Sequence, residues 1–222
     1  IVVGNFVGPT ALGAVSIPGP IIWIASSIAA GMGSGTNIIA AQYFGAERKT
    51  ELRSAAVTSV LFSALLGLLL SGVCILCAPG MVVHLLQTPA EMKSDAIAYL
   101  AIYSAGFFFQ MLYQAFYGIT RAFGDSKASL LFLLVAALLN LILDLLFVVS
   151  LGMGVAGAAI ASVIAQVGSA VAAFLYLMLR YPFLRPQRRD MRPDLRQLAL
   201  ILRVSIPVTL QMVVQSAGFL LL

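Results

Sequence analysis

Charged residues are scarce in this chain of 222 residues: Lys, Arg, Asp and Glu make up 9% of it, hydrophobic residues make up 61%, and the mean hydropathy is +1.04. A soluble globule needs a surface on which about 25–35% of the residues are charged. This chain cannot cover itself in that way, so we expect lipid to be its main solvent. The same shortage of polar residues excludes an intrinsically disordered chain and a sequence-reading nucleic-acid domain.

Cysteine and histidine are scarce as well, with two cysteines and one histidine in the whole chain. Cys74 and Cys77 lie inside one apolar run, which excludes a disulfide framework and a zinc site. His84 lies at the end of that run, and no HExxH motif is present, so serine–histidine and zinc hydrolases are disfavoured. Residues 31–35 (GMGSG) resemble a nucleotide loop only superficially, because no soluble strand precedes them. We therefore expect no enzyme activity and no cofactor.

Long hydrophobic runs dominate what remains. A bilayer core about 30 Å thick needs about 20 apolar residues in a helix. Residues 1–7 and 198–222 resemble parts of further spans, so the chain is expected to be a fragment cut at both ends. Proline inside the apolar runs, at Pro18, Pro20 and Pro207, predicts bent spans. Five stretches reach the required length: 11–44, 54–83, 96–121, 128–151 and 155–181.

Two short segments carry helix-end signals. Residues 88–91 (TPAE) have the spacing of a capping box, with Pro89 at the first helical position. Residues 124–126 (GDS) offer a glycine stop followed by a capping aspartate. Both segments are expected to separate consecutive spans.

The basic residues indicate orientation. Of the 13 Lys and Arg residues, all but Lys93 fall in the segments after the first, third and fifth complete spans. The positive-inside rule places these segments in the cytoplasm. The run within residues 180–203 is interpreted as a topology signal and an anchor for lipid headgroups. The twelve residues are Arg48, Lys49, Arg53, Arg121, Lys127, Arg180, Arg185, Arg188, Arg189, Arg192, Arg196 and Arg203.

One acidic residue, Asp144, lies inside an apolar run. A carboxylate at that depth costs about 2.5–3.5 kcal/mol on insertion scales and usually faces a bundle interior or an ion path. Asn140, four residues earlier, shares its helical face. The pair forms an oxygen-rich half-site for Na⁺ or for a proton, which the polar stripe of Ser162, Gln166 and Ser169 in the next span could complete. The alternative is that Asp144 lies near the outer end of its span and is merely hydrated.

Amides and phenols form a stripe along residues 96–121. The stripe predicts a cavity wall suited to amphipathic organic cations. Ser34 and Asn37 continue a similar polar line in the first complete span, which favours a central water-accessible cavity. For Tyr99 and Tyr103 an interfacial aromatic belt is the alternative. The stripe consists of Tyr99, Tyr103, Gln110, Gln114 and Tyr117.

Several ordered segments resemble the multidrug and toxic compound extrusion (MATE) family of secondary transporters. They cover nearly the whole chain. The segments are residues 3–8 (VGNFVG), 35–46 (GTNIIAAQYFGA), 117–127 (YGITRAFGDSK), 140–147 (NLILDLLF) and 154–159 (GVAGAA).

The resemblance implies an all-α, polytopic membrane protein of twelve helices in two six-helix lobes, of which this chain covers most of the first. Residues 1–181 would form the N-terminal transmembrane lobe, 182–197 a cytoplasmic basic linker, and 198–222 the start of the seventh helix. The remaining lobe would belong to the same longer chain. The protein would lie in the cell membrane.

The resemblance also implies a cation site. Asn140, Asp144 and Ser162 match the amide, carboxylate and hydroxyl that sodium- or proton-coupled members use, with serine where threonine is frequent. An aspartate on helix one would precede Ile1. Gln114 departs from the family pattern, in which asparagine commonly follows the tyrosine.

The expected function is therefore Na⁺- or H⁺-coupled antiport that exports small amphipathic, cationic organic compounds by alternating access. A lipid-linked saccharide flippase of the same superfamily is an alternative. Such proteins tend to line their cavity with cationic residues, whereas every arginine of this chain lies close to a loop. A non-transporting membrane scaffold is another, and an intramembrane hydrolase is the weakest.

Overall fold

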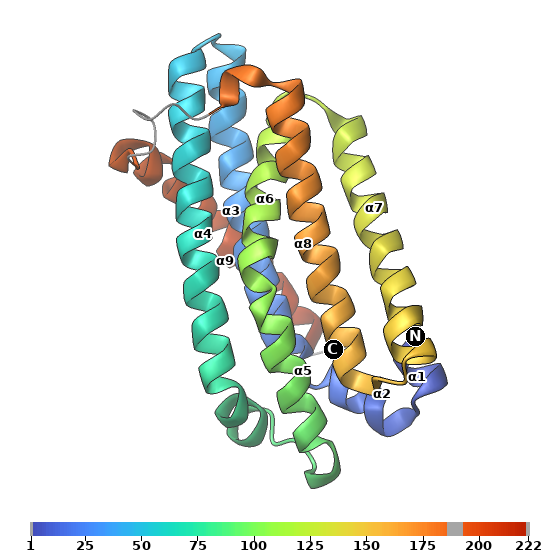
Figure 1. Ribbon diagram of the computed structural model, residues 1–222. Helices are drawn as coiled ribbons and strands as arrows, with labels where there is room; N and C mark the ends of the chain where they lie inside the picture. Colours follow the sequence, from blue (N-terminus) through green and yellow to red (C-terminus); the bar gives the residue numbers. More distant parts are fainter. Residues whose placement is uncertain (1, 186–192, 221–222) are drawn as a thin grey trace.

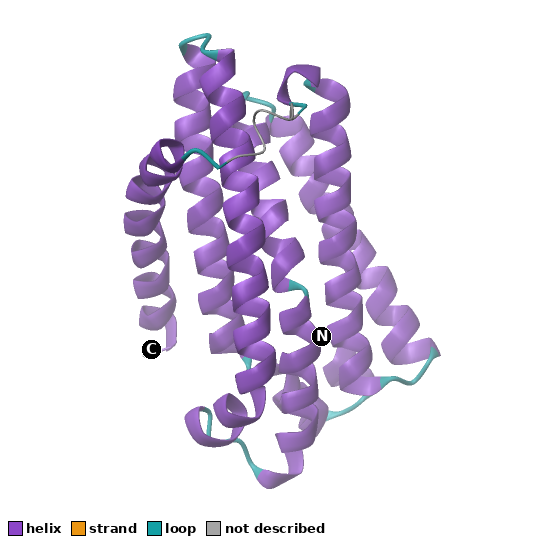
Figure 2. Cartoon of the chain, turned by 60° about the vertical axis from the view of Figure 1, so that its left-hand side comes forward, coloured by secondary structure: helices purple, strands orange, loops and turns teal. Residues whose placement is uncertain are grey.

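The computed structural model describes residues 2–185 and 193–220, and within them every regular element is a helix (Figures 1 and 2). This confirms the expected all-α class. Arg188, Arg189 and Arg192 of the basic run lie outside the described residues. The elements are α1 (Val2–Phe6), α2 (Pro9–Ser16), α3 (Gly19–Gly45), α4 (Lys49–Gly80), η1 (Met81–Leu85), η2 (Ala90–Met92), α5 (Lys93–Ala105), α6 (Phe107–Ala122), α7 (Ser126–Asp144), η3 (Leu145–Ser150), α8 (Gly154–Arg180), η4 (Pro182–Leu184) and α9 (Leu195–Leu220).

Four helical stretches among the described residues are long and apolar enough to cross a membrane: α4 with η1, α7 with η3, α8, and α9. Two further spans arise if the bent pairs α2–α3 and α5–α6 each count as one, which gives up to six. The five complete stretches expected from hydropathy are thus confirmed, and α9 is the sixth.

The outer surface of the bundle is apolar, as a lipid solvent requires. Trp23 on α3 is 65% exposed and Leu76 on α4 is 83% exposed. Helix α7 is the extreme case, since its buried residues are only Ala128, Ser129 and Phe132. A water-facing helix would reverse this pattern.

Two of the spans are bent. The 40° bend between α2 and α3 falls at Pro18, the residue that caps α3, and this confirms the bend expected there. The 42° bend between α5 and α6 falls at Gly106, where no proline signals it. The Oε1 atom of Gln166, from α8, occupies the space that a Cβ at Gly106 would need, so a larger residue at this break would have to displace the Gln166 carboxamide.

The helix-end predictions had mixed outcomes. Asp125 caps α7 as expected, with its Oδ1 accepting from the Ala128 N–H at 3.1 Å, and Gly124 adopts φ +73°. The capping box at residues 88–91 is wrong. Thr88 donates its hydroxyl back to the Val82 carbonyl at 2.8 Å, and Pro89 is itself the N-cap residue of the short helix η2. The carbonyls released at the end of a π-helical turn take up the hydroxyl that the cap would have used.

The helices run alternately up and down, so the segments rich in Arg and Lys meet at one end of the bundle (Figure 1). We call this the basic end. It holds residues 46–48 between α3 and α4, residues 123–125 between α6 and α7, and residues 181–185 after α8. Lys93 and His84 lie toward the opposite end.

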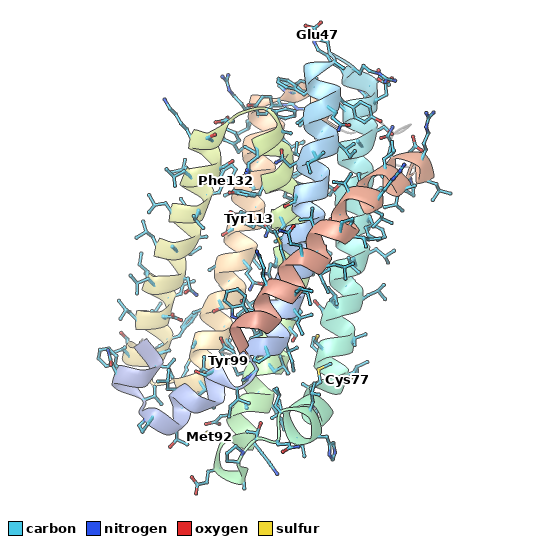
Figure 3. All side chains as sticks on the ribbon, turned by 180° about the vertical axis from the view of Figure 1, so that it is seen from behind. Glu47, Cys77, Met92, Tyr99, Tyr113 and Phe132 are labelled. Carbon is cyan, nitrogen blue, oxygen red and sulfur yellow. The ribbon has the colours of Figure 1, made fainter. Side chains whose placement is uncertain are left out.

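Glycine permits backbone-to-backbone packing around α3. A Cβ on Gly118 of α6 would collide with the carbonyl oxygen of Gly33. On another side of α3, Cβ atoms on Gly31 and Gly35 would collide with the hydroxyls of Thr209 and Ser205 on α9. The superficial nucleotide-loop pattern of residues 31–35 is therefore a packing device between three helices. Figure 3 shows α9 crossing obliquely in front of α3.

Candidate functional site

Asp144 is the last residue of α7, at the point where the span continues as the π-helical turn η3. The side chain is half-buried, and its Oδ1 atom is buried with no hydrogen-bond partner among the described residues. π-helical turns are rare in helices generally, and those that occur are often found at functional sites. A buried carboxylate oxygen without a donor normally indicates an absent ligand, proton or water.

Asn140 lies one turn before Asp144 and links α7 to α8. Its Nδ2 donates to the Ser162 hydroxyl at 3.3 Å. This bond leaves the amide oxygen of Asn140 as an acceptor for a cation or a proton donor. The structure therefore brings together the three residues expected to form the cation site, Asn140 and Ser162 by direct contact and Asp144 as the neighbour one turn away.

Helix α5 supplies the opposing wall. The rings of Tyr99 and Tyr103 lie 5.8 Å apart, and Tyr99 interacts electrostatically with Asp144. Tyr99 is only 7% exposed and packs in a core cluster with Val148 of η3. The aromatic-belt alternative is therefore wrong for Tyr99, because a belt residue faces lipid headgroups. The position of Tyr99 can be followed in Figure 3.

Gln166 of α8 joins the same group of residues. Its carboxamide lies beside the Tyr103 phenol and against the α5–α6 break at Gly106. Its Oε1 atom is buried and has no hydrogen-bond partner within the described part of the chain. Asp144 and Gln166 thus each carry a buried oxygen acceptor without a donor among the described residues.

The remaining predicted lining residues lie elsewhere, on α3 and α6. Gln110 donates its Nε2 to the Ser26 hydroxyl of α3 at 3.0 Å. Tyr117 stacks beside Tyr113, with ring centroids 5.8 Å apart, and Arg121 lies over the Tyr117 ring. Ser34, Asn37 and Gln114 are half-buried on the same two helices. The bend at Gly106 divides the predicted stripe, so Tyr103 and Gln110 serve different helix contacts.

The described residues contain no group of three or more His, Cys, Asp or Glu side chains that could hold a metal ion. A Na⁺ ion at Asp144 would therefore have one carboxylate and several neutral oxygens as ligands. The side-chain oxygens of Asn140, Ser162 and Gln166 are hard ligands, the type that alkali cations prefer.

A second polar cluster, at the basic end, was not expected from the sequence. The Oδ2 atom of Asp125 accepts from the Tyr176 hydroxyl at 2.5 Å and from the Tyr181 hydroxyl at 3.2 Å. The bond from Tyr176, together with those from the Ala128 N–H and Tyr181, holds the pKa of Asp125 below its ordinary value. The cluster fastens the start of α7 to the end of α8.

Comparison with known proteins identifies the fold. The family model described as MatE matches residues 1–146. The chain belongs to the MATE family. Proteins of this family are multi-pass membrane transporters and not enzymes.

One relative is the "Probable multidrug resistance protein YoeA" of Bacillus subtilis (strain 168), 30% identical over 223 aligned positions. The alignment covers 96% of this chain and 48% of that protein. The chain thus spans about half the length of the relatives that it matches.

Solved structures of a MATE multidrug resistance transporter of the MOP superfamily match in two conformations. The outward-facing form has a TM-score of 0.91 at 29% identity, covering 99% of this chain and 49% of that one. The inward-facing form has a TM-score of 0.90 at 28% identity, covering 97% of this chain and 49% of that one. The helices described above are therefore those of one MATE half.

Proposed function

We propose that the longer protein containing this chain is a Na⁺- or H⁺-coupled antiporter that exports small amphipathic organic cations. The observation that carries the proposal is the buried Oδ1 atom of Asp144, which has no donor within the described residues and lies one turn from the Asn140–Ser162 pair. A carboxylate kept in an apolar span costs free energy and is retained where a mobile positive charge neutralises it.

Coupling follows from the two occupants that this site can hold in turn. When a proton or Na⁺ neutralises Asp144, the site loses its attraction for a cationic substrate. When the ion leaves, the negative charge favours entry of the substrate near the Tyr99 and Tyr103 rings. A ligand shifts a conformational equilibrium only by its different affinity for the two states, and exchange at one carboxylate supplies that difference.

The alternating motion is proposed to move this half largely as a unit. The equal likeness to outward-facing and inward-facing structures, with TM-scores of 0.91 and 0.90, supports such a motion. Helix α1 lies against η3, next to Asp144, where the family resemblance implies a further acidic residue on helix one. Residues 1–181 are proposed to form the N-terminal lobe, 182–197 a linker, and α9 the first helix of the other lobe.

The basic end is proposed to face the cytoplasm. Of the Lys and Arg residues that the structure describes, only Lys93 lies toward the opposite end. Basic segments are retained on the cytoplasmic side during insertion. Asp144 would then lie toward the outer half of the membrane.

The test is transport by the full-length protein in vesicles, with a fluorescent organic cation as substrate. A Na⁺ gradient and a proton gradient are imposed separately. We expect accumulation of the dye under one of the two gradients and its loss when the matching ionophore collapses that gradient. Accumulation that persists without either gradient would contradict ion coupling.

A further inference from the structure

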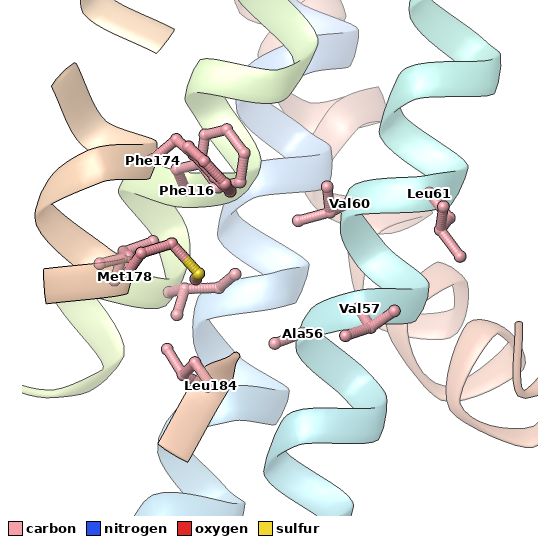
Figure 4. A pocket seen from close by; sticks show the side chains of 10 residues that line it. Ala56, Val57, Val60, Leu61, Phe116, Phe174, Met178 and Leu184 are labelled. Atoms are coloured by element: carbon pink, nitrogen blue, oxygen red, sulfur yellow. The ribbon is translucent and has the colours of Figure 1, made fainter. Parts of the chain in front are cut away.

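A groove near the basic end of the bundle, remote from Asp144, has no part in the proposed transport. It lies between α4 and α8, and α6 forms its floor (Figure 4). Val60 comes from α4, Phe116 and Ile119 from α6, and Phe174 and Met178 from α8. The short helix η4 adds Leu184, which is 4% exposed, to the lining at the end nearest the basic end.

All ten side chains that line the groove are apolar. Sites for small organic ligands carry a few polar groups that orient the ligand. This groove offers no such group from its lining, so its chemistry suits a flexible hydrocarbon chain. The rim residues Leu61 and Phe174 are 38% and 43% exposed, which keeps the groove open toward the side.

The groove lies on the face of the bundle opposite α9. Figure 1 shows α4, α6 and α8 on the near side with α9 behind them, and the reverse view in Figure 3 places α9 in front.

A fixed positive charge lies at the end of the groove nearest the basic end of the bundle. Arg185 directly follows Leu184, and its Nε donates to the carbonyl of Met178, a lining residue, at 3.3 Å. This bond uses one of the five N–H donors of the guanidinium. Lys49 lies on the same face of α4 as Ala56 and Val60. It is two helical turns beyond Ala56 toward the basic end.

We propose that the groove binds one acyl chain of an anionic phospholipid from the leaflet at the basic end, with the lipid phosphate against Arg185. The charge at the mouth selects the occupant. A guanidinium attracts a phosphate and repels the organic cations proposed as substrates. The hydrocarbon chain fills the apolar slot that side chains leave open.

The test uses the full-length protein in detergent, stripped of lipid and titrated with phosphatidylglycerol or with phosphatidylcholine of the same acyl chains. Native mass spectrometry counts the bound lipids. Val60→Trp fills the groove and is expected to weaken phosphatidylglycerol binding about tenfold, because about two methylene groups lose their burial. Leu76→Trp is the matched control on α4 and is expected to bind as the wild type does, since Leu76 lies outside the groove.

A second variant tests the headgroup separately. Arg185 is exposed, so Arg185→Gln does not disturb packing. It is expected to reduce the preference for phosphatidylglycerol about fivefold and to leave phosphatidylcholine binding unchanged.

If the wild-type protein holds no lipid that Val60→Trp displaces, the groove is empty or covered by protein and the proposal is wrong. If Arg185→Gln keeps the full preference for phosphatidylglycerol, the assignment of the phosphate to Arg185 is overturned. Neither readout needs an ion gradient, so both are independent of the proposed antiport.

Discussion

Helix α7 carries an aspartate at each end, and the two carboxylates lie in opposite surroundings. Asp125, at the basic end, accepts hydrogen bonds from the Ala128 N–H, Tyr176 and Tyr181. Asp144, at the other end, has a buried Oδ1 atom with no donor among the residues that the structure describes. A carboxylate whose donors are all built into the fold has a structural role. A carboxylate that lacks such donors is available to bind a ligand reversibly.

The largest difference is expected in transport. Asp144→Asn in the full-length protein should reduce gradient-driven efflux about 5- to 150-fold, the range of typical coupling free energies, because the neutral amide cannot exchange a proton or hold a cation as a carboxylate does. Dye efflux from vesicles that contain equal amounts of inserted protein measures it. Asp125→Asn is the matched control and should keep most of the efflux for each inserted molecule. Equal losses in the two variants would remove the functional distinction between the carboxylates.

The free energy of unfolding should respond in the reverse order, with a larger effect of substitution at Asp125 than at Asp144. Asp125→Ala removes a helix cap and two phenol-to-carboxylate hydrogen bonds, so the free energy of unfolding should fall by about 2 kcal/mol. Thermal unfolding of the purified full-length protein in detergent, followed by tryptophan fluorescence, measures this change. Asp144→Asn should alter the free energy of unfolding by less than about 0.5 kcal/mol, since it breaks no bond with a described residue. A larger loss for Asp144→Asn would mean that Asp144 is a packing residue.

The sequence predicts the spans and the cap at Asp125 because both depend on local patterns. A lipid solvent requires helices of fixed length, and hydropathy reports that length directly. The Ala128 N–H is three residues from Asp125, within the reach of cap rules. The tyrosines that complete the Asp125 cluster are 51 and 56 residues away. No periodicity predicts such a contact, and the resemblance did not point to it.

The candidate site was predicted to a similar depth. The four-residue spacing of Asn140 and Asp144 places both on one helical face, and the polar stripe of the next span and the family resemblance both pointed to Ser162, which contacts Asn140 in the structure. The ion-binding role of these residues stays a prediction. The burial of Tyr99 was left open, because a belt and a pore wall have the same helical spacing. The bend at Gly106 was missed, since no proline signals it.

Acid should weaken the stabilising contribution of Asp125. Its pKa is depressed in the folded protein, chiefly by the hydrogen bond from Tyr176. Its contribution is therefore present above the unfolded pKa of about 3.9 and is lost as the pH falls through the folded pKa. The difference in melting temperature between wild type and Asp125→Asn should stay constant from about pH 8 to pH 5 and shrink below about pH 4. A difference that already shrinks near pH 6 would show that another group titrates in its place.

The smallest expected effect separates a ligand position from a packing position on α8. Ser162→Ala removes the acceptor of the Asn140 amide, whereas Ser169 donates its hydroxyl at 2.6 Å to the Ala165 carbonyl of its own helix. If Ser162 orients Asn140 toward the coupling ion, Ser162→Ala should raise the ion concentration for half-maximal efflux about threefold, the equivalent of one weak hydrogen bond. Ser169→Ala should leave that concentration unchanged. A response to neither serine would remove Ser162 from the ion site, and an equal response to both would indicate a packing effect on α8 instead of an orienting role for Ser162.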